Sequence, residues 1–566
     1  MAQQAANGSA ERIGVDGQLT MKRHLAPALV CAAVLLGGWL RLSGLEARSI
    51  SHPEMYVPGI RLPAGISEPS ERLTVRNVLT GTFSSDTHPP GYYLLMLPWT
   101  RQLGTSLLAL RLPSALLGIA CIPLLYLVGV LLHQTSAGAF AAVLLALNGY
   151  HIFWSQVARM FSLACFLGLL STVLLLLIAR EAPRTRLVLA AYVFTVLCGL
   201  TTHIFFWALL AAQMCWAFAN AKADLWRGQL LTAILGSPLI AFAAYQSATT
   251  VADLSANALE YLLEFLPFAF LWPTAQSGFF PSAIPLQSAA LRIALLVIAA
   301  ILAISGLRAL ETRSTSDQRP ISSGFWHSVW LAGGVLATLA ILLFVYSTRQ
   351  LPAEYIHPTI SITKLLVGLP LLLAAVAIAL DRLSPRVQFP SVPLIPVLAF
   401  APILILALVS QFRPLLNQRG LLFAAPYLLL LLSVGLLALG KIRWLVAVPV
   451  LAACAVSPIA YSRMMVDTAD YHQFAAAVQS EIQTNDLVFV RKAWYETPIF
   501  YYLSADRFRL VGRDYEAARF RNPDSRVWVV LLYDPDPAYD MKQALSGYQS
   551  IKTIVGPHMK AILYRP

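Results

Sequence analysis

The chain has 566 residues, of which 58% are hydrophobic and only 12% are charged. This balance excludes an ordinary soluble globular protein and predicts a membrane protein with the lipid bilayer as its surroundings. Its 41 Lys and Arg outnumber its 28 Asp and Glu, for a net charge of +13. In so apolar a chain this excess favours basic loops sorted across a membrane and not nucleic-acid binding.

Apolar runs long enough to cross a bilayer, about 17 to 25 residues, recur along most of the chain. The first follows "MKRH" and has no small-residue cleavage site after it, so we expect an uncleaved span and not a signal peptide. Residues 1–24 then form an N-terminal tail and residues 25–461 a membrane domain. The thirteen expected spans are 25–43, 108–131, 136–149, 159–179, 187–200, 203–219, 229–247, 289–307, 326–346, 363–380, 391–410, 421–439 and 444–461.

Short basic clusters recur in alternate loops, which predicts a cytoplasmic N-terminus under the positive-inside rule. The clusters contain Lys22, Arg23, Arg180, Arg184, Arg186, Lys222, Arg227, Arg308, Arg313, Arg319, Arg382, Arg386, Lys441 and Arg443. Thirteen spans from an inside start leave the C-terminal residues outside. The same count makes 44–107 the largest outer loop, with 248–288 second and 150–158 among the short ones.

Residues 462–566 differ in composition from the rest of the chain. Short β-branched runs such as "DLVFV", "RVWVVLLY" and "IKTIVG" alternate with polar helical patterns, which predicts a small soluble α/β domain. All six cysteines lie in expected spans and none in this domain. We therefore expect neither disulfides nor zinc clusters.

Chemically reactive side chains gather at the outer ends of several spans. Arginine can bind phosphate oxygens in a forked geometry, and a carboxylate can take a proton from a hydroxyl or an amine. The pattern suits an anionic substrate held at the membrane surface, whereas charges in mid-membrane are too scarce for an ion-coupled pump. The candidates are Glu54, Asp86, His88, Arg111, Arg159, His203, Glu354, Arg413 and Arg419.

Four stretches resemble the motifs of bacterial relatives of dolichyl-phosphate-mannose protein mannosyltransferases, within the GT-C superfamily of membrane glycosyltransferases. They are "SDTHPPGYYLLMLPWT" from Ser85, "LNGYHIFWSQVARMFSL" from Leu147, "LTTHIFFWALL" from Leu200 and "FRPLLNQRGLLFAAPY" from Phe412. The layout of thirteen spans and an exported C-terminal domain is also similar to that of the lipid A aminoarabinose transferases. The resemblance implies an all-α polytopic GT-C fold in the bacterial inner membrane.

The resemblance also implies a reaction, the inverting transfer of a sugar from a polyprenyl phosphate to an acceptor on the periplasmic face. In these families an acid of the first outer loop acts as the base. The matching place reads "SHPEM", where Pro53 replaces one acid of a pair and Glu54 remains. Glu54 is thus the first candidate and Asp86 the second. The alternatives are a solvated loop acid for Glu54 and a turn-capping residue for Asp86.

The substrate-binding candidates carried over from the resemblance are His88, Arg159, His203 and Arg419. Arg159 and Arg419 match the phosphate-contacting arginines, although a usual glutamate is replaced by Val157 and a usual tyrosine by Gly420. Losing that glutamate removes a potential metal ligand, so no obligatory cofactor is implied. For Arg159, and for the weaker candidates His203 and Arg413, the alternative is a side chain that snorkels or anchors at the interface.

His88 has a structural alternative as well, an interfacial position before a helix that begins at Pro89 and Pro90. We expect Arg111, within "LRLPSALLG", to support the loop and not to touch substrate. At the level of the whole protein, two alternatives to glycosyl transfer stay open. One is a flippase or transporter of polyprenyl-linked lipids, and the other is an assembly scaffold that acts through its C-terminal domain.

Overall fold

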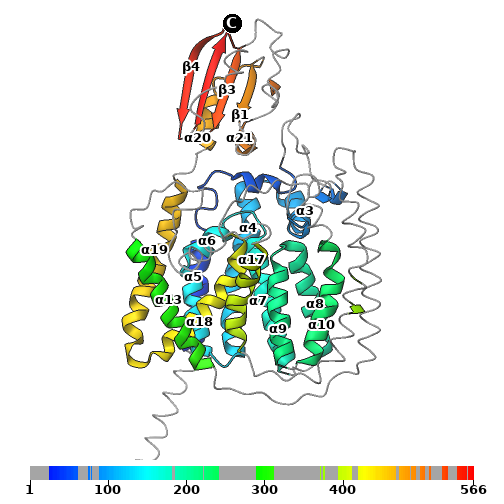
Figure 1. Cartoon of the computed structure of the whole chain (residues 1–566). Helices are drawn as coiled ribbons and strands as arrows, with labels where there is room; N and C mark the ends of the chain where they lie inside the picture. The colour runs from blue at the N-terminus through cyan, green and yellow to red at the C-terminus, as the bar shows by residue number, and fades with distance from the viewer. Residues whose placement is uncertain are drawn as a thin grey trace, which may run out of the picture.

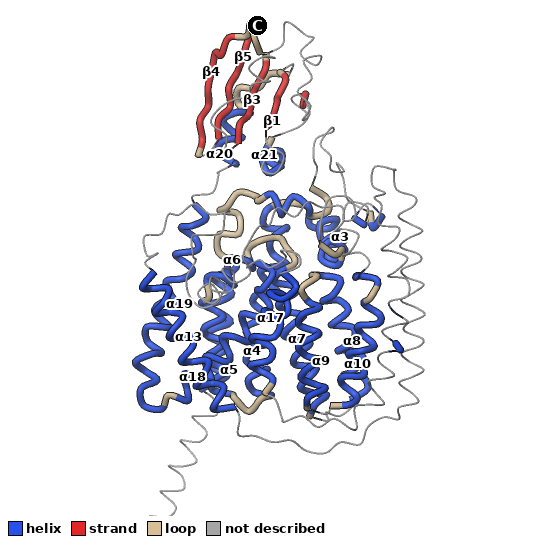
Figure 2. The backbone as a smooth tube through the Cα atoms, in the orientation of Figure 1, coloured by secondary structure: helices blue, strands red, loops and turns tan. Residues whose placement is uncertain are grey.

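A computed structural model of the chain contains a large helical body and a small sheet domain at one end of it (Figure 1). Helices dominate the body, and the strands lie in the C-terminal part of the chain (Figure 2). The structure describes residues 25–60, 74–76, 78–79, 88–180, 185–220, 222–240, 289–310, 370, 374–375, 393–410, 419–466, 471–484, 486–491, 497–503, 509–510, 526–532, 545–557 and 559–566.

Helices occupy the expected spans wherever the structure describes them. They are Leu25–Leu42, α4 (Leu107–Leu131), α5 (Thr135–Leu147), α7 (Phe161–Ala179), α8 (Thr185–Thr202), α9 (Phe206–Ala219), α10 (Ala223–Gly236), α13 (Ala289–Leu310), α17 (Leu394–Ser410), α18 (Ala425–Ala438) and α19 (Arg443–Val466). Six helical segments among the described residues are long and apolar enough to cross a membrane, or seven with one bent pair. The span 326–346, and nearly all of 363–380, lie outside the described residues, so the count of thirteen stays a prediction.

The bent pair corrects the expectation of a loop at 150–158. After α5 the chain turns by 61° and continues as the short helix α6 (Gly149–Ser155). The Asn148 side chain caps α6 by accepting the His151 N–H at 2.9 Å, and the buried Arg41 donates to two carbonyls at the end of α5, Leu145 O at 2.9 Å and Ala146 O at 3.0 Å. A cation is favourable at a helix C-terminus, so the Asn148 cap and Arg41 from the first helix together stabilise the bend.

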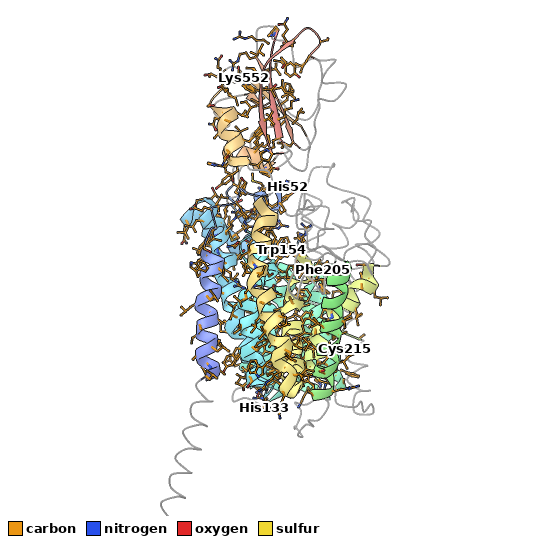
Figure 3. All side chains as sticks on the ribbon, turned by 90° about the vertical axis from the view of Figure 1, so that its left-hand side faces the viewer. His52, His133, Trp154, Phe205, Cys215 and Lys552 are labelled. Carbon is orange, nitrogen blue, oxygen red and sulfur yellow. The ribbon has the colours of Figure 1, made fainter. Side chains whose placement is uncertain are left out.

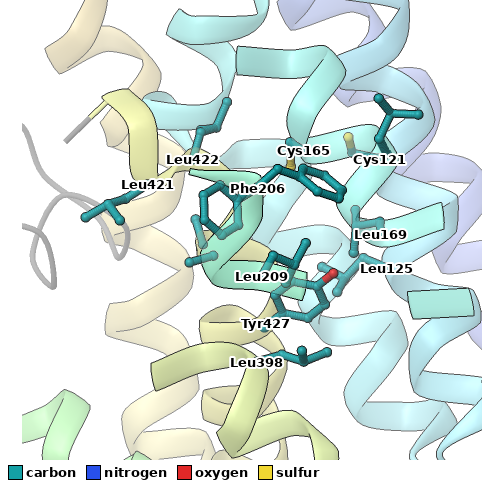
Figure 4. Packing of buried hydrophobic residues seen from close by; sticks show 14 of the residues in the cluster. Cys121, Leu125, Cys165, Leu169, Phe206, Leu209, Leu398, Leu421, Leu422 and Tyr427 are labelled. Atoms are coloured by element: carbon teal, nitrogen blue, oxygen red, sulfur yellow. The ribbon is translucent and has the colours of Figure 1, made fainter. Parts of the chain in front are cut away.

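Polar side chains link several helices inside the apolar body. The Tyr192 hydroxyl of α8 donates to Gln213 Oε1 of α9 at 2.6 Å, and Gln213 Nε2 donates to Thr172 Oγ1 of α7 at 3.2 Å. The Thr172 hydroxyl lies 2.7 Å from that of Tyr427 on α18, which Figure 4 shows among packed leucines. Interhelical hydrogen bonds in a bilayer contribute roughly 0.6–2 kcal/mol each, so this network fixes how the four helices pack.

Glu54 lies in the 3₁₀ helix η1 (His52–Tyr56), and Arg419 begins the 3₁₀ helix η4 (Arg419–Ala424). His88 lies just before helix α3 (Gly91–Leu103). Helix α3 lies at the end of the body that faces the sheet domain (Figure 1). Figure 3 shows His52 at the same end and His133 at the opposite one. These elements therefore place the candidate site beneath the C-terminal domain.

The C-terminal domain is a five-stranded sheet with helices α20 (Tyr471–Gln479) and α21 (Thr497–Tyr502). Its strand order is β2-β1-β3-β5-β4; β1 pairs in parallel with β2 and β3, and β5 pairs antiparallel with β3 and β4. The central β3 is buried along its whole length, as its unbroken apolar sequence predicts. The strands are β1 (Leu487–Arg491), β2 (Arg509–Leu510), β3 (Val527–Leu532), β4 (Gln549–Gly556) and β5 (Met559–Arg565), which confirms the small C-terminal α/β unit.

Candidate functional site

Glu54 lies at the centre of a closed set of hydrogen bonds in the first outer loop. Arg111 Nε donates to its Oε1 at 2.8 Å and Nη2 to its Oε2 at 2.9 Å. The Ala158 N–H donates to Oε1, while the N–H and hydroxyl of Ser51 both donate to Oε2, each at 2.9 Å. Ser51 and Glu54 form a capping box for η1. Five donors thus surround a carboxylate that offers about four lone-pair sites.

This environment decides the charge of Glu54. The residue is 1% exposed. Burial alone would raise the pKa of its carboxyl, but the charge of Arg111 and the hydrogen bonds lower that pKa to about 2. The alternative of a solvated loop acid is therefore wrong. The role of general base stays a prediction, and the low pKa counts against it because an acid this strong binds a proton weakly.

Arg111 supports the loop, as expected from the sequence. Besides Glu54, its guanidinium donates to Leu45 O at 2.7 Å and to the carbonyl oxygens of Arg48 and Ser49 at 2.9 Å each. All its partners precede η1 or lie within it, and Arg111 is 2% exposed. One arginine from α4 therefore holds the whole segment from Leu45 to Glu54 against the helical body.

Arg159 follows directly after the amide that Glu54 binds, and it precedes α7. Its Nη1 donates to Pro53 O at 3.0 Å and to the Tyr93 hydroxyl of α3 at 2.5 Å. The guanidinium carbon lies 5.8 Å from the ring centres of both Tyr56 and Tyr93. With 4% exposure, Arg159 is held between the loop and α3 and does not extend to solvent as a snorkelling arginine would.

A glycine brings His88 and His203 together. A Cβ on Gly91, the first residue of α3, would lie 2.6 Å from the carbonyl oxygen of Thr201 near the end of α8. Only glycine permits this approach of the two backbones. His88 lies just before Gly91 and His203 just after Thr201, and their ring centroids are 5.3 Å apart.

The surroundings of His88 set its charge, and a hydrogen bond of His203 sets its tautomer. Burial lowers the pKa of His88, and the positive charges of Arg159 and Arg419 lower it further, well below its usual 6.5, so the ring is neutral at pH 7. His203 Nδ1 accepts the Phe205 N–H at 3.1 Å. When that ring is neutral its proton is on Nε2, which is then a hydrogen-bond donor.

Arg159 and Arg419 therefore both lie close enough to His88 to act on its charge, although they come from distant parts of the sequence. We call His88, Arg159, His203 and Arg419 the cationic site. These four are the predicted substrate-binding residues: the His88 and His203 rings lie side by side, and Arg159 and Arg419 lie within electrostatic range of His88. Two guanidinium groups and two imidazoles can together donate several hydrogen bonds to anionic oxygens.

Several sequence candidates lie outside the described residues, namely Asp86, Glu354 and Arg413. The sequence interpretation also missed contributors. Tyr56 and Tyr93 flank Arg159, although Tyr93 stands within the quoted motif. Ser51 carried a recognisable signal, because "SHPE" is the S-x-x-E pattern of a capping box.

Aromatic side chains pack beside His203. The Phe161 ring lies 5.8 Å from the His203 ring and 4.8 Å from that of Trp154, and the Phe205 ring lies 4.9 Å from His203. Figure 3 shows Trp154 and Phe205 in the half of the body nearest the C-terminal domain. The cationic site thus lies beside a mostly buried cluster of aromatic side chains.

A second group of reactive side chains lies deeper, where ligand atoms of Cys121, His151 and Cys165 are within 4.8 Å of one another. Figure 4 shows the two cysteines in the apolar packing. Arg41 Nη2 lies 3.0 Å from His151 Nδ1, and a guanidinium can only donate. The imidazole proton is therefore on Nε2, which faces Cys165 Sγ at 3.6 Å. With no lone pair on Nε2, the group fits a hydrogen-bonded cluster and not a metal site.

No protein-family model matches the chain, and no curated protein matches it. Among solved structures it is similar to ArnT from Cupriavidus metallidurans bound to undecaprenyl phosphate, at 15% identity over 95% of this chain and 97% of that chain, with a TM-score of 0.45. It is also similar to the oligosaccharyltransferase AglB from Archaeoglobus fulgidus in complex with an inhibitory peptide and a dolichol-phosphate, at 13% identity over 90% of this chain and 69% of that chain, with a TM-score of 0.41. A third similar structure is the arabinofuranosyltransferase AftD from Mycobacteria, at 13% identity over 96% of this chain and 40% of that chain, with a TM-score of 0.41.

Proposed function

We propose that this protein is a GT-C type glycosyltransferase that takes a sugar from a polyprenyl-phosphate donor and transfers it to an acceptor at the membrane surface. One observation carries the proposal, the meeting of His88, Arg159, His203 and Arg419 from four separate segments. The four sequence motifs that resemble this superfamily contain these same residues. A lipid phosphate suits such a site because its head is anionic while its tail can lie against apolar helices.

In the proposed reaction the acceptor oxygen or nitrogen attacks the anomeric carbon from the side opposite the phosphate. The bond from that carbon to the phosphate oxygen breaks, polyprenyl phosphate leaves with the electron pair, and the acceptor's proton passes to a carboxylate. Arg159 and Arg419 stabilise the charge that grows on the phosphate, an effect of several kcal/mol in comparable sites. Because His203 Nδ1 accepts the Phe205 N–H, its Nε2 is the atom that can donate to the phosphate. Glu54 holds Arg159 in place through the Ala158 amide and the Pro53 carbonyl.

Two carboxylates remain candidates for the base. Glu54 is adjacent to the cationic site, but its oxygens are occupied and its pKa is low. Asp86 precedes His88 by two residues, and we assign it the proton transfer. The proposal also includes the membrane setting: a bacterial inner membrane, a cytoplasmic N-terminus, and a cationic site and C-terminal domain on the periplasmic side.

The test is to incubate the purified protein with a labelled polyprenyl-phosphate sugar and a cell-envelope extract as the source of acceptor, and to measure free polyprenyl phosphate. Release requires bond cleavage, whereas a flippase would move intact donor between the leaflets of a vesicle. We expect release by the wild type and by Arg101→Ala, which changes an exposed arginine of α3. We expect none from Arg159→Ala. Movement of intact donor without release, or full activity of Arg159→Ala, would refute the proposal.

A further inference from the structure

The C-terminal domain touches the loop that carries Glu54. The hydroxyl of Tyr502, the last residue of α21, accepts the backbone N–H of Ile50 at 2.8 Å. The backbone N–H of His472, in α20, donates to Ser49 Oγ at 3.4 Å. Figure 1 shows α20 and α21 at the end of the domain nearest the helical body. Ile50 itself is 1% exposed, so its amide depends on a protein partner.

The neighbouring tyrosine reaches a second element. The Tyr501 hydroxyl donates to Thr105 O at 2.7 Å. Thr105 precedes Ser106, whose side chain caps α4 by accepting the Ala109 N–H at 3.2 Å. The same helix α4 carries Arg111. Two adjacent tyrosines of the soluble domain therefore hold both structures that meet in the Glu54–Arg111 pair, the loop and the start of α4.

From Ile50 the contacts continue to the cationic site. Its neighbour Ser51 donates twice to Glu54, which accepts the Ala158 N–H beside Arg159. The next residue, Pro53, supplies the carbonyl that accepts from Arg159 Nη1. A shift of Ile50 would thus move the backbone that positions the Arg159 guanidinium.

We propose that Tyr501 and Tyr502 are positioning residues, through which the C-terminal domain keeps Arg159 in the geometry needed to bind a lipid phosphate. The binding arm of this inference rests on the proposed function, and the structural arm does not. The ring centroids of Tyr501 and Tyr502 lie 5.0 Å apart, and the ring centroid of His472 lies 5.4 Å from that of Tyr502. A Tyr→Phe change keeps this packing and removes only the hydroxyl.

The structural arm uses amide hydrogen exchange on the full-length protein. In Tyr502→Phe we expect faster exchange at residues 49–56 and at Ala158, whose amide is bonded to Glu54. The matched control is Tyr564→Phe, the same chemical change in β5 two residues before the end of the chain. Figure 1 marks the C-terminus at the end of the domain that is far from the helical body. Faster exchange confined to residues 471–566, or unchanged exchange everywhere, would overturn the inference whatever the protein binds.

The binding arm measures the affinity for polyprenyl phosphate without a sugar. We expect Tyr502→Phe to bind about 3- to 10-fold more weakly, since it leaves the buried Ile50 amide without its acceptor, and Tyr501→Phe to bind more weakly by a smaller factor. Tyr564→Phe should bind as the wild type does. In turnover, the change should appear in KM for the donor more than in kcat. If the wild type does not bind, the proposed function fails; if the wild type and Tyr502→Phe bind equally, only this inference fails.

Discussion

Two acid–arginine pairs with buried carboxylates have nearly the same geometry. In the first outer loop, Arg111 donates to both oxygens of Glu54 at 2.8 and 2.9 Å. In the C-terminal domain, Arg526 donates to both oxygens of Asp486 at 2.9 and 2.6 Å. Each carboxylate also accepts a backbone amide within its own turn, from Ser51 and from Gln483 respectively.

The pairs differ in what they connect. Asp486 accepts in addition from Trp528 Nε1 at 2.9 Å, so all its partners belong to one small domain and the pair closes a turn onto β3. Glu54 joins three distant segments, and its partner Ala158 is followed by Arg159. Bidentate geometry and a buried carboxylate therefore do not by themselves identify a catalytic acid. Glu54 differs from Asp486 in lying next to the cationic site, because it accepts the Ala158 N–H beside Arg159.

The largest expected effect separates the two regions by activity. Arg159→Lys keeps the charge but loses the forked geometry, so we expect sugar transfer to fall about 100-fold, the loss typical of one transition-state donor. Arg526→Lys should leave transfer per folded molecule within about twofold, because that arginine supports only its own domain. Rates measured on monodisperse protein check this. Equal losses in both variants would break the distinction.

The next effect is on stability and should be shared. Glu54→Gln leaves the buried Arg111 without its carboxylate, which costs about 3–5 kcal/mol in comparable pairs. Asp486→Asn should also destabilise the protein, but by less, because the side chain of Arg526 is 16% exposed. Thermal unfolding in detergent should show both losses. Affinity for polyprenyl phosphate should fall only in Glu54→Gln. Normal binding with lost turnover in this variant would instead restore Glu54 as the base.

A pH titration isolates the charge of Glu54. Its folded pKa of about 2 lies below the ordinary 4.5, so its stabilisation is present above pH 4.5 and is lost as the pH falls towards 2. By linkage the full difference is about 3 kcal/mol. The gap in thermal stability between the wild type and Glu54→Gln should therefore shrink over this range. A gap that stays constant with pH would show that Glu54 does not act through its charge.

The smallest effect concerns the capping box. Ser51→Ala removes one of the five donors to Glu54 and keeps the Ser51 amide, so we expect a loss of about 1 kcal/mol in stability. Binding of polyprenyl phosphate should weaken about two- to fivefold by the same shift of the loop. Ser480→Ala, which changes an exposed serine bonded only within its own helix region, is the control. Identical binding in the two variants would detach Ser51 from the cationic site.

Much of the fold could be predicted because it depends on local composition. Apolar length identified the membrane helices, and β-branched runs identified β1, β3 and β4. The bend after α5 was missed because it depends on the Asn148 cap and on Arg41 from another helix. The ion pair of Glu54 was missed for the same kind of reason, since its partner Arg111 is 57 positions away and no periodicity in the sequence reports such a pairing.

Hydrophobicity and motif spacing are properties of the chain alone, and they were enough to predict a membrane protein, its helical stretches and the candidate cationic residues. The proximity of His88 and His203 could be seen only in the tertiary structure, since it depends on the close approach of Gly91 to the Thr201 carbonyl. The ionised state of Glu54 and its full set of hydrogen bonds also depend on the tertiary structure, because burial and distant donors set the pKa of a carboxyl group.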